Sequence, residues 1–255
     1  MNAPMSSSPK SAATEVKRRE GGSREKLRIS DLHAFYGESH ILHGIDLCAR
    51  QGELVTLLGR NGAGRSTTLK AIMNMVGRRS GSIVINGRET IDMPAHRIAH
   101  LGMGFCPEER GIFASLSVEE NLLLPPTVRS DGFPLEEIYA LFPNLAERRK
   151  SQGTRLSGGE QQMLAMARIL RTGANILLLD EITEGLAPVI VQKLGEVLIN
   201  LKARGLTVVL VEQNFRFAAP IADRHYVMEH GHIVEEVQAQ ELAAKTELLN
   251  TYLGV

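Results

Sequence analysis

Residues 54–66 read LVTLLGRNGAGRS, and this run sets the architecture of the chain. Its first five residues are almost wholly apolar, which predicts a strand buried on both faces of a mainly parallel sheet. Gly59, Gly62 and Gly64 then allow a tight backbone curve, and a helix is expected from near Gly64 to about Met75. A glycine-rich loop between a buried strand and a helix N-terminus points its N–H groups at an anion. The run therefore predicts a phosphate-binding loop.

The loop matches the pattern G-x-x-x-x-G-K-[ST], except that Arg65 stands where lysine is usual. The pattern predicts binding of a nucleoside triphosphate, with ATP as the first candidate. The Ser66 hydroxyl is expected to hold Mg²⁺. A glycine-rich turn with no ligand is the alternative. The residues expected around the phosphates are Gly59, Arg60, Asn61, Gly62, Ala63, Gly64, Arg65, Ser66 and Thr67.

Length and composition are those of an ordinary α/β protein. The 255 residues, 43% of them hydrophobic, suffice for one α/β unit with a modest insertion. Lys and Arg total 29 and Asp and Glu total 29, so no net field draws the chain to nucleic acid. Cys48 and Cys106 lack a metal-ligand spacing, so buried thiols in a reducing compartment are expected. No apolar run reaches the length of a transmembrane helix.

The first third of the sequence predicts a tail followed by an antiparallel sheet. Residues 1–26, rich in Ser, Lys and Arg, predict a disordered tail, and residues 27–255 predict one domain. Short alternating runs over 27–53 predict antiparallel strands. Asn86-Gly87 after an apolar run predicts a hairpin turn, because this pair tolerates positive φ angles.

The second half alternates buried strands with helices. Short helical pieces broken by Pro and Gly predict a helical insertion over about 109–165. Apolar strands are expected at 176–179 and 206–211, with an amphipathic helix from Pro188 between them. This alternation predicts a doubly wound sheet that binds ligands at the carboxyl ends of its strands.

An acidic pair, Asp180-Glu181, follows the second apolar strand. From that position one carboxylate can reach Mg²⁺ and the other can polarise water, so Asp180 is expected at the metal and Glu181 at the attacking water. An acidic helix cap is the alternative.

The segment LSGGEQQ, residues 156–162, places a Ser-Gly-Gly turn before a helix. Such a turn makes a second anion-binding helix N-terminus at Ser157, Gly158 and Gly159. The alternative is a helix N-cap and nothing more.

A phosphate loop, then LSGGEQQ, then ILLLDE, in that order, resembles the ATP-binding subunit of an ABC transporter. The resemblance runs from about Leu27 to the C-terminus. It implies a P-loop NTPase fold, with a RecA-like core, an antiparallel β subdomain and a helical insertion carrying LSGGE. It also implies two subunits arranged head to tail, in which Ser157, Gly158 and Gly159 of one complete the ATP site of the other.

The resemblance assigns roles to three further residues. Tyr36 matches the aromatic residue that stacks on adenine, although a tyrosine packed in the core is the alternative. Glu108 falls where the family has a glutamine that touches Mg²⁺. Gln213 falls where the family has a histidine that contacts the γ-phosphate. Together with Arg65 and Glu181, Gln213 forms the expected catalytic set.

Several positions depart from the family pattern. Arg65 keeps the charge of lysine with a planar, forked group, and Gln213 donates a hydrogen bond without titrating. Hydrolysis is therefore expected to be slow or to depend on Glu181. Ile182 replaces a proline, and TEGLAP (183–188) replaces the usual loop. Pro107-Glu108, VEQN and EGLAP are nevertheless similar to one ATPase of bacterial branched-chain amino acid importers.

This subtype resemblance implies an ATPase that works with a second ATP-binding subunit, membrane permeases and, indirectly, a periplasmic solute-binding protein. Its implied place is the cytoplasmic face of the bacterial inner membrane, as a peripheral subunit. Two other classes stay open. One is a subunit that clamps ATP without hydrolysing it, and the other is an ABC ATPase acting in translation or DNA repair.

Overall fold

The structure, a computed structural model, describes residues 24–130 and 132–253. The tail expected over residues 1–26 lies outside the described residues, except for its last three. Of these, Glu25 and Lys26 belong to the first strand, β1 (Glu25–Tyr36), so the folded part begins two residues before the expected boundary. Within the described ranges, every helix is too short or too polar to span a lipid bilayer.

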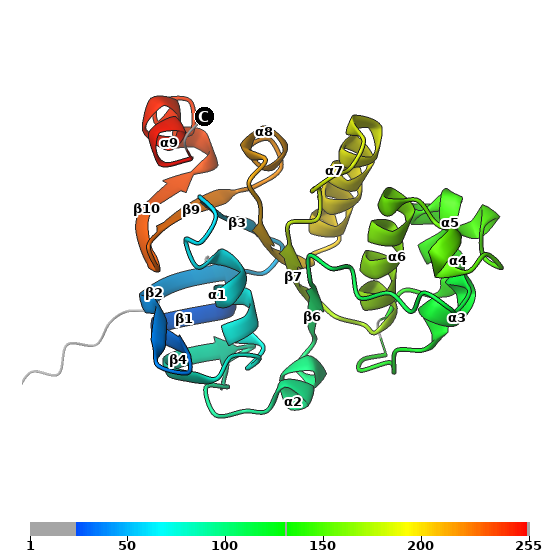
Figure 1. Cartoon of the computed structure of the whole chain (residues 1–255), viewed down its shortest axis with the longest axis horizontal. Coiled ribbons are helices and arrows are strands. Elements are labelled where there is room, and N and C mark those ends of the chain that lie inside the picture. The colour runs from blue at the N-terminus through cyan, green and yellow to red at the C-terminus, as the bar shows by residue number, and fades with distance from the viewer. Residues whose placement is uncertain (1–23, 131, 254–255) are drawn as a thin grey trace, which may run out of the picture.

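A six-stranded sheet runs through the centre of the molecule (Figure 1). Its strands, in spatial order, are β10 (His232–Gln238), β9 (Arg224–Glu229), β3 (Leu54–Gly59), β8 (Thr207–Val211), β7 (Ile176–Asp180) and β6 (Met103–Cys106). Only the pair β9–β10 is antiparallel. Every residue of β3, β7 and β8 is buried, as expected for apolar strands covered on both faces. The predicted mainly parallel sheet is confirmed.

A second, antiparallel sheet packs beside the first. Its order is β2 (Ser39–Arg50), β1, β4 (Arg78–Ile85) and β5 (Arg88–Glu89). The hairpin predicted at Asn86-Gly87 joins β4 to β5, and both turn residues have positive φ, 51° and 80°. α2 (Ala95–His100) then leads the chain to β6.

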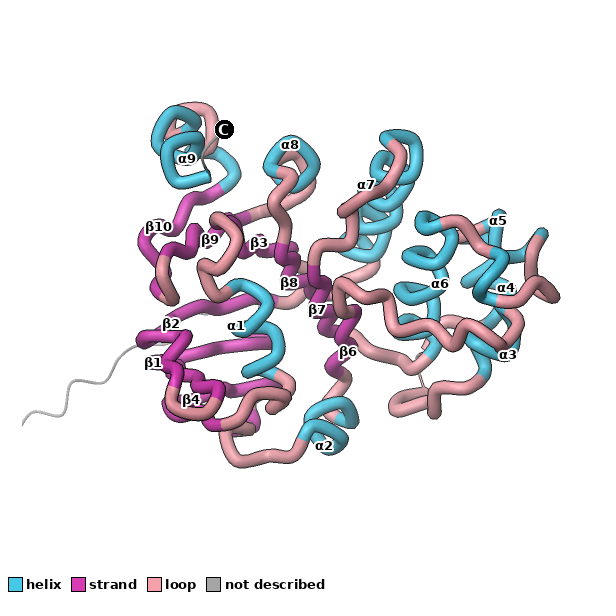
Figure 2. The backbone as a smooth tube through the Cα atoms, in the orientation of Figure 1, coloured by secondary structure: helices cyan, strands magenta, loops and turns pink. Residues whose placement is uncertain are grey.

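Helix α1 (Arg65–Ile72) follows β3 and packs against strands of both sheets (Figure 2). It ends three residues earlier than expected, because Asn74 adopts a left-handed conformation with φ 55° that stops the helix. Gly59, at the start of the phosphate loop, has φ 153°, and a Cβ there would lie 2.3 Å from the Met228 carbonyl oxygen of β9. Glycine is required at this crossing, which ties the loop to the sheet.

The helical part lies on the side of β6 and β7 that is opposite the antiparallel sheet, at the right in Figure 1. Its elements are α3 (Val118–Leu123), α4 (Leu135–Leu141), α5 (Pro143–Glu147), a 3₁₀ turn (Gly153–Arg155) and α6 (Gly158–Arg171). The remaining helices are α7 (Pro188–Ala203), α8 (Phe215–Ala218), a 3₁₀ turn (Ala239–Glu241) and α9 (Thr246–Leu253). Pro188 occupies the first turn of α7, as predicted.

Candidate functional site

The phosphate loop borders a cavity of about 430 Å³ at the carboxyl ends of the central strands. Gly62 and Gly64 have φ angles of 82° and 105°, so the backbone curls as the motif predicts. The N-cap of α1 is Gly64, which makes no side-chain cap hydrogen bond, so the first amides of the helix face an anion site. The cavity is lined by Ile41, Asn61, Gly62, Ala63, Gly64, Arg65, Ser66, Thr67, Glu108, Glu181, Glu184 and Gln213.

Arg65 is 4% exposed and points from the start of α1 into this cavity. Its Nη2 donates to Glu181 Oε1 at 2.8 Å and to Asn61 Oδ1 at 3.2 Å. Its Nη1 is buried and has no hydrogen-bond partner among the described residues. Burial lowers the pKa of Arg65, and the nearby carboxylate of Glu181 partly opposes this shift. A buried guanidinium nitrogen without a partner is costly, and a phosphate oxygen would satisfy it.

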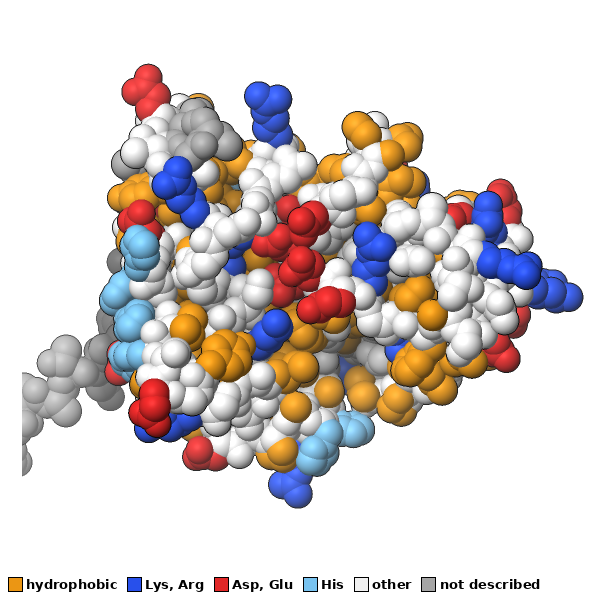
Figure 3. Space-filling view, in the orientation of Figure 1, with side chains coloured by type: hydrophobic (Ala, Val, Ile, Leu, Met, Phe, Trp, Pro, Cys, Tyr) orange, Lys and Arg blue, Asp and Glu red, His pale blue; other side chains and the backbone are white. Residues whose placement is uncertain are grey.

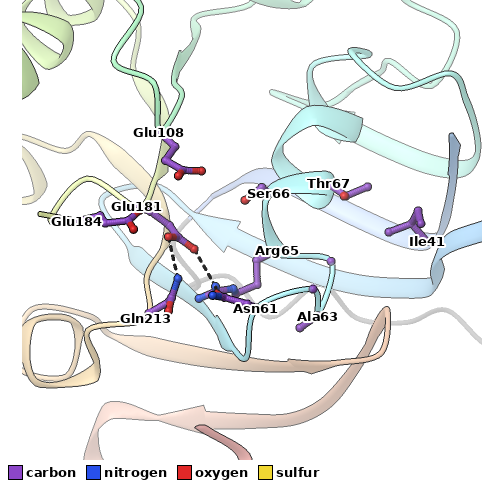
Figure 4. Close-up of a pocket in the computed structure, with 12 residues that line it drawn as sticks. Ile41, Asn61, Ala63, Arg65, Ser66, Thr67, Glu108, Glu181, Glu184 and Gln213 are labelled. Atoms are coloured by element: carbon purple, nitrogen blue, oxygen red, sulfur yellow. Dashed lines mark hydrogen bonds and ion pairs between the residues drawn. The ribbon is translucent and has the colours of Figure 1, made fainter.

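Glu181 lies between Arg65 and Gln213 (Figure 4). Gln213 Nε2 donates to Glu181 Oε2 at 2.9 Å, so both carboxylate oxygens of Glu181 have partners. The three residues expected to form the catalytic set therefore meet at one point. In this arrangement Glu181 is held by the two neighbours, and an attacking water must compete with them for the carboxylate.

Ser66 and Asp180 form a second close pair, from the start of α1 and the end of β7. The Ser66 hydroxyl donates to Asp180 Oδ1 at 2.9 Å. Burial raises the pKa of Asp180, while the Ser66 hydrogen bond acts in the opposite direction. Two ligands at neighbouring octahedral positions of Mg²⁺, each at about 2.0–2.1 Å, lie about 2.9 Å apart. The hard oxygen atoms and their spacing thus fit the metal expected from the sequence.

Glu108 reaches the cavity from the loop after β6. Carboxylate oxygens of Glu108, Glu181 and Glu184 all lie within 4.8 Å of one another. Burial raises the pKa of Glu108, and the negative charges of Glu181 and Glu184 raise it further. Glu184 was not expected at the site, although its position three residues after Glu181 is a signal for it. Ile41 also lines the cavity, and no motif marks it.

The segment from Ser157 to Gly159 does not reach this cavity. The Ser157 hydroxyl accepts a hydrogen bond from the Glu160 amide, and Glu160 Oε2 accepts from the Ser157 amide at 2.8 Å, which makes a capping box for α6. A separate hollow of about 710 Å³ contains Ser157. Within one chain, the two predicted phosphate cradles are therefore not brought together.

Tyr36 ends β1 and is 42% exposed. This exposure rules out the alternative in which Tyr36 packs in the core. Its side chain is free to contact a ligand, although it does not line the cavity described above. Arg60, at the tip of the phosphate loop, is likewise exposed.

Glu212 is a buried neighbour of the site that sequence reasoning missed. Glu212 comes directly after β8, next to the end of β7 where Asp180 lies. Ligands bind at the carboxyl ends of such strands, so this position in the sequence is a signal for a site residue. Its carboxylate accepts hydrogen bonds from the Thr183 amide at 3.1 Å and the Thr183 hydroxyl at 3.0 Å. These bonds join the loop after β7 to the loop after β8. Burial raises the pKa of Glu212 to about 7, against the opposing effect of the Thr183 hydrogen bonds.

The raised pKa of Glu212 predicts a pH-dependent stability. The folded chain favours the protonated carboxyl, so this stabilisation is complete below a pH of about 4.5 and is lost as the pH rises through about 7. The difference amounts to about 3 kcal/mol. Glutamine cannot titrate, so Glu212→Gln should not lose this stability. As the pH rises from 5 to 8, we expect the free energy of unfolding of Glu212→Gln, measured by urea denaturation, to increase relative to that of the wild type. Parallel pH profiles for the two proteins would contradict the assignment.

Known proteins resemble this chain in sequence and in fold. The family model described as ABC transporter matches residues 42–184. The high-affinity branched-chain amino acid transport ATP-binding protein BraG of Pseudomonas aeruginosa is 39% identical over 231 residues, which cover 89% of this chain and 99% of that protein. The lipopolysaccharide export system ATP-binding protein LptB of Haemophilus influenzae is 31% identical, over 89% of this chain and 97% of that protein.

A solved ATP-binding cassette of an ABC transporter, in its ADP conformation, superposes with a TM-score of 0.77. The superposition covers 91% of this chain and 100% of the solved cassette. At 21% identity, this similarity is evidence for the fold alone. The P-loop NTPase fold predicted from the sequence is thereby confirmed. Because the family model spans more than half of its residues, the chain belongs to the ABC transporter family, as an ATP-binding subunit.

Proposed function

We propose that this chain hydrolyses ATP with Mg²⁺ to drive an importer of branched-chain or related amino acids. The observation that carries the hydrolysis is the meeting of Arg65, Glu181 and Gln213 beside the Ser66–Asp180 pair in one cavity. The cargo rests on the higher identity to BraG, 39%, against 31% for LptB, which is named for lipopolysaccharide export.

The residues act on ATP in the following way. The loop amides and the free Nη1 of Arg65 bind the phosphates, and Asn61 steadies the guanidinium. Ser66, Asp180 and Glu108 would hold Mg²⁺, which supplies charge neutralisation of the phosphate oxygens when it is bound. Phosphate attracts Arg65 away from Glu181, and the freed carboxylate then orients water for in-line attack. Gln213 donates a hydrogen bond to the γ-phosphate.

A second ATP-binding subunit is proposed to complete the site. Ser157, Gly158 and Gly159 lie outside the cavity of their own chain, so the start of α6 can face the nucleotide of a head-to-tail subunit, identical or different. Tyr36 is exposed, as a residue that stacks on adenine must be. In this proposal, membrane permeases supply the span, this chain is a peripheral subunit on the cytoplasmic face of the inner membrane, and a periplasmic solute-binding protein is an indirect partner.

The rival proposal is a subunit that clamps ATP without hydrolysing it. One observation favours it: both oxygens of Glu181 are occupied by Arg65 and Gln213. Single-turnover hydrolysis of labelled ATP separates the two proposals, because the clamp releases no phosphate.

We expect Glu181→Gln to lower ATP turnover by about 10²–10⁴-fold and to leave ATP binding intact, because the amide cannot act as a base. The measurement is phosphate release by the chain assembled with its permeases and partner subunit. Glu184→Gln is the matched control, since Glu184 lines the same cavity and, among the described residues, its side chain forms no hydrogen bond with Arg65 or Gln213. Unchanged turnover in Glu181→Gln would refute the assignment.

We expect Arg65→Lys to raise turnover several-fold, because lysine is shorter and has one terminal nitrogen in place of the Nη2 that holds Glu181 and the Nη1 that is free for phosphate, so that binding phosphate releases the carboxylate. Arg65→Ala removes the charge altogether and should weaken ATP binding by about 10–100-fold, the worth of a charge-assisted hydrogen bond. Nucleotide binding and phosphate release are measured on the same preparations. Slower turnover in Arg65→Lys would show that the fork itself is needed in the transition state.

The cargo is tested in proteoliposomes that contain the permeases, the partner subunit and the solute-binding protein. We expect leucine, isoleucine or valine to stimulate phosphate release. If lipopolysaccharide stimulates phosphate release and none of the three amino acids does, the import proposal is wrong. Lipopolysaccharide export, for which the relative LptB is named, then replaces it.

A further inference from the structure

A row of imidazole rings lies on the antiparallel sheet, apart from the nucleotide cavity. His33 on β1 and His40 and His43 on β2 share one face of the hairpin, and His232 at the start of β10 continues the row. Figure 3 shows histidine side chains, in pale blue, gathered along the left edge of the molecule. None of the four lines the cavity at the phosphate loop.

Two of these rings turn ring nitrogens toward each other. His33 Nδ1 and His40 Nε2 are 3.0 Å apart. On the other side of the ring, His33 Nε2 lies 3.1 Å from Asp31 Oδ1. A carboxylate accepts only, so it fixes the proton of His33 on Nε2 and leaves a lone pair on Nδ1 that faces His40.

The strand register produces this approach. His33 pairs with His43 across the strands, and Phe35 pairs with His40, so all four side chains share one face. Phe35 stacks on the His40 ring with centroids 4.2 Å apart and 14° between planes, and Arg78 covers the Phe35 ring at 4.1 Å. The His43 ring lies 4.0 Å from that of His40. The packing therefore orients His40 before any ligand arrives.

The spacing matches that of two nitrogens bound to one ion. Imidazole nitrogens bind Zn²⁺ at about 2.0–2.1 Å, so two ligands at angles between 90° and the tetrahedral value lie about 2.9–3.4 Å apart. A carboxylate that orients a ligating histidine through its other nitrogen is the usual outer partner of such sites. A simple N–H···N hydrogen bond between the two rings is the competing explanation, and it predicts no affinity for metal.

We propose that His33 and His40 chelate a divalent transition-metal ion such as Zn²⁺, Ni²⁺ or Cu²⁺, with Asp31 as the orienting carboxylate and His43 as the adjacent imidazole. The ion would tie β1 to β2 below the turn that carries Tyr36. The first half of β2 is linked to the phosphate loop, because the His43 amide donates to the Gly231 carbonyl and the Gly231 amide donates to the Ala63 carbonyl, each at 2.9 Å. Metal binding would thus stiffen the hairpin next to the nucleotide site.

The test is calorimetric titration of the full chain, without an affinity tag or nucleotide, with Zn²⁺. We expect His33→Gln and His40→Gln each to weaken binding by more than about tenfold, and Asp31→Asn to weaken it by about 10–100-fold through the lost orientation of His33. His96→Gln, which removes an exposed histidine on α2, is the matched control and should bind as the wild type does.

Electron paramagnetic resonance of the Cu²⁺-loaded chain gives an independent readout. We expect nitrogen superhyperfine structure from at least two imidazoles, lost in the His33→Gln/His40→Gln double variant. Zn²⁺ binding that is unchanged in the double variant, or a Cu²⁺ spectrum without imidazole nitrogen, would overturn the proposal. Because the titration uses no ATP, its outcome is independent of whether the chain hydrolyses nucleotide.

Discussion

The site is organised by one buried electrostatic contact, the ion pair between Arg65 and Glu181. Both side chains are nearly excluded from water, at 4% and 10% exposure, so each compensates the charge of the other, and Asn61 and Gln213 add one hydrogen bond each. The pair still leaves Arg65 Nη1 unsatisfied, and this nitrogen makes the cavity a place for an anion. An ATP phosphate that satisfies Arg65 also weakens its hold on Glu181. Binding of the substrate and release of the proposed base are thereby linked through a single guanidinium.

The sheet order explains why these residues can meet. β3, β8 and β7 are neighbours and parallel, so the loops that follow them emerge at the same edge. β3 delivers Arg65 and Ser66, β7 delivers Asp180 and Glu181, and β8 delivers Gln213. Buried Glu212 then joins the last two loops through Thr183. A displacement of either loop is therefore transmitted to the other.

The LSGGE segment caps its own helix and, in the proposed dimer, also faces the second subunit. Its capping box satisfies amides at the start of α6, so the N-cap alternative is correct for the isolated chain. The same helix start lies away from the cavity of its own chain and is open to a facing subunit in the proposed dimer. Capping and a role across the interface are compatible, because the Ser157 side chain bonds to Glu160 while Ser157 itself is exposed and Gly158 is partly exposed.

Local patterns in the sequence determined β3 and its loop, the Asn86-Gly87 hairpin, the N-cap of α6 at Ser157 and the family. Each depends on residues a few positions apart, whose backbone preferences act without the rest of the chain. Tertiary structure alone decided the contact of Arg65 with Glu181, the gathering of Glu184 with Glu108, and the approach of His33 to His40. These side-chain contacts depend on strand order, strand register and bulges, which set the side-chain positions to within an ångström. The periodicity of a single sequence does not specify strand order or register to that precision. The early end of α1 before Asn74 also involves a tertiary contact, because the Asn74 side-chain amide donates to the Met93 carbonyl at 3.0 Å.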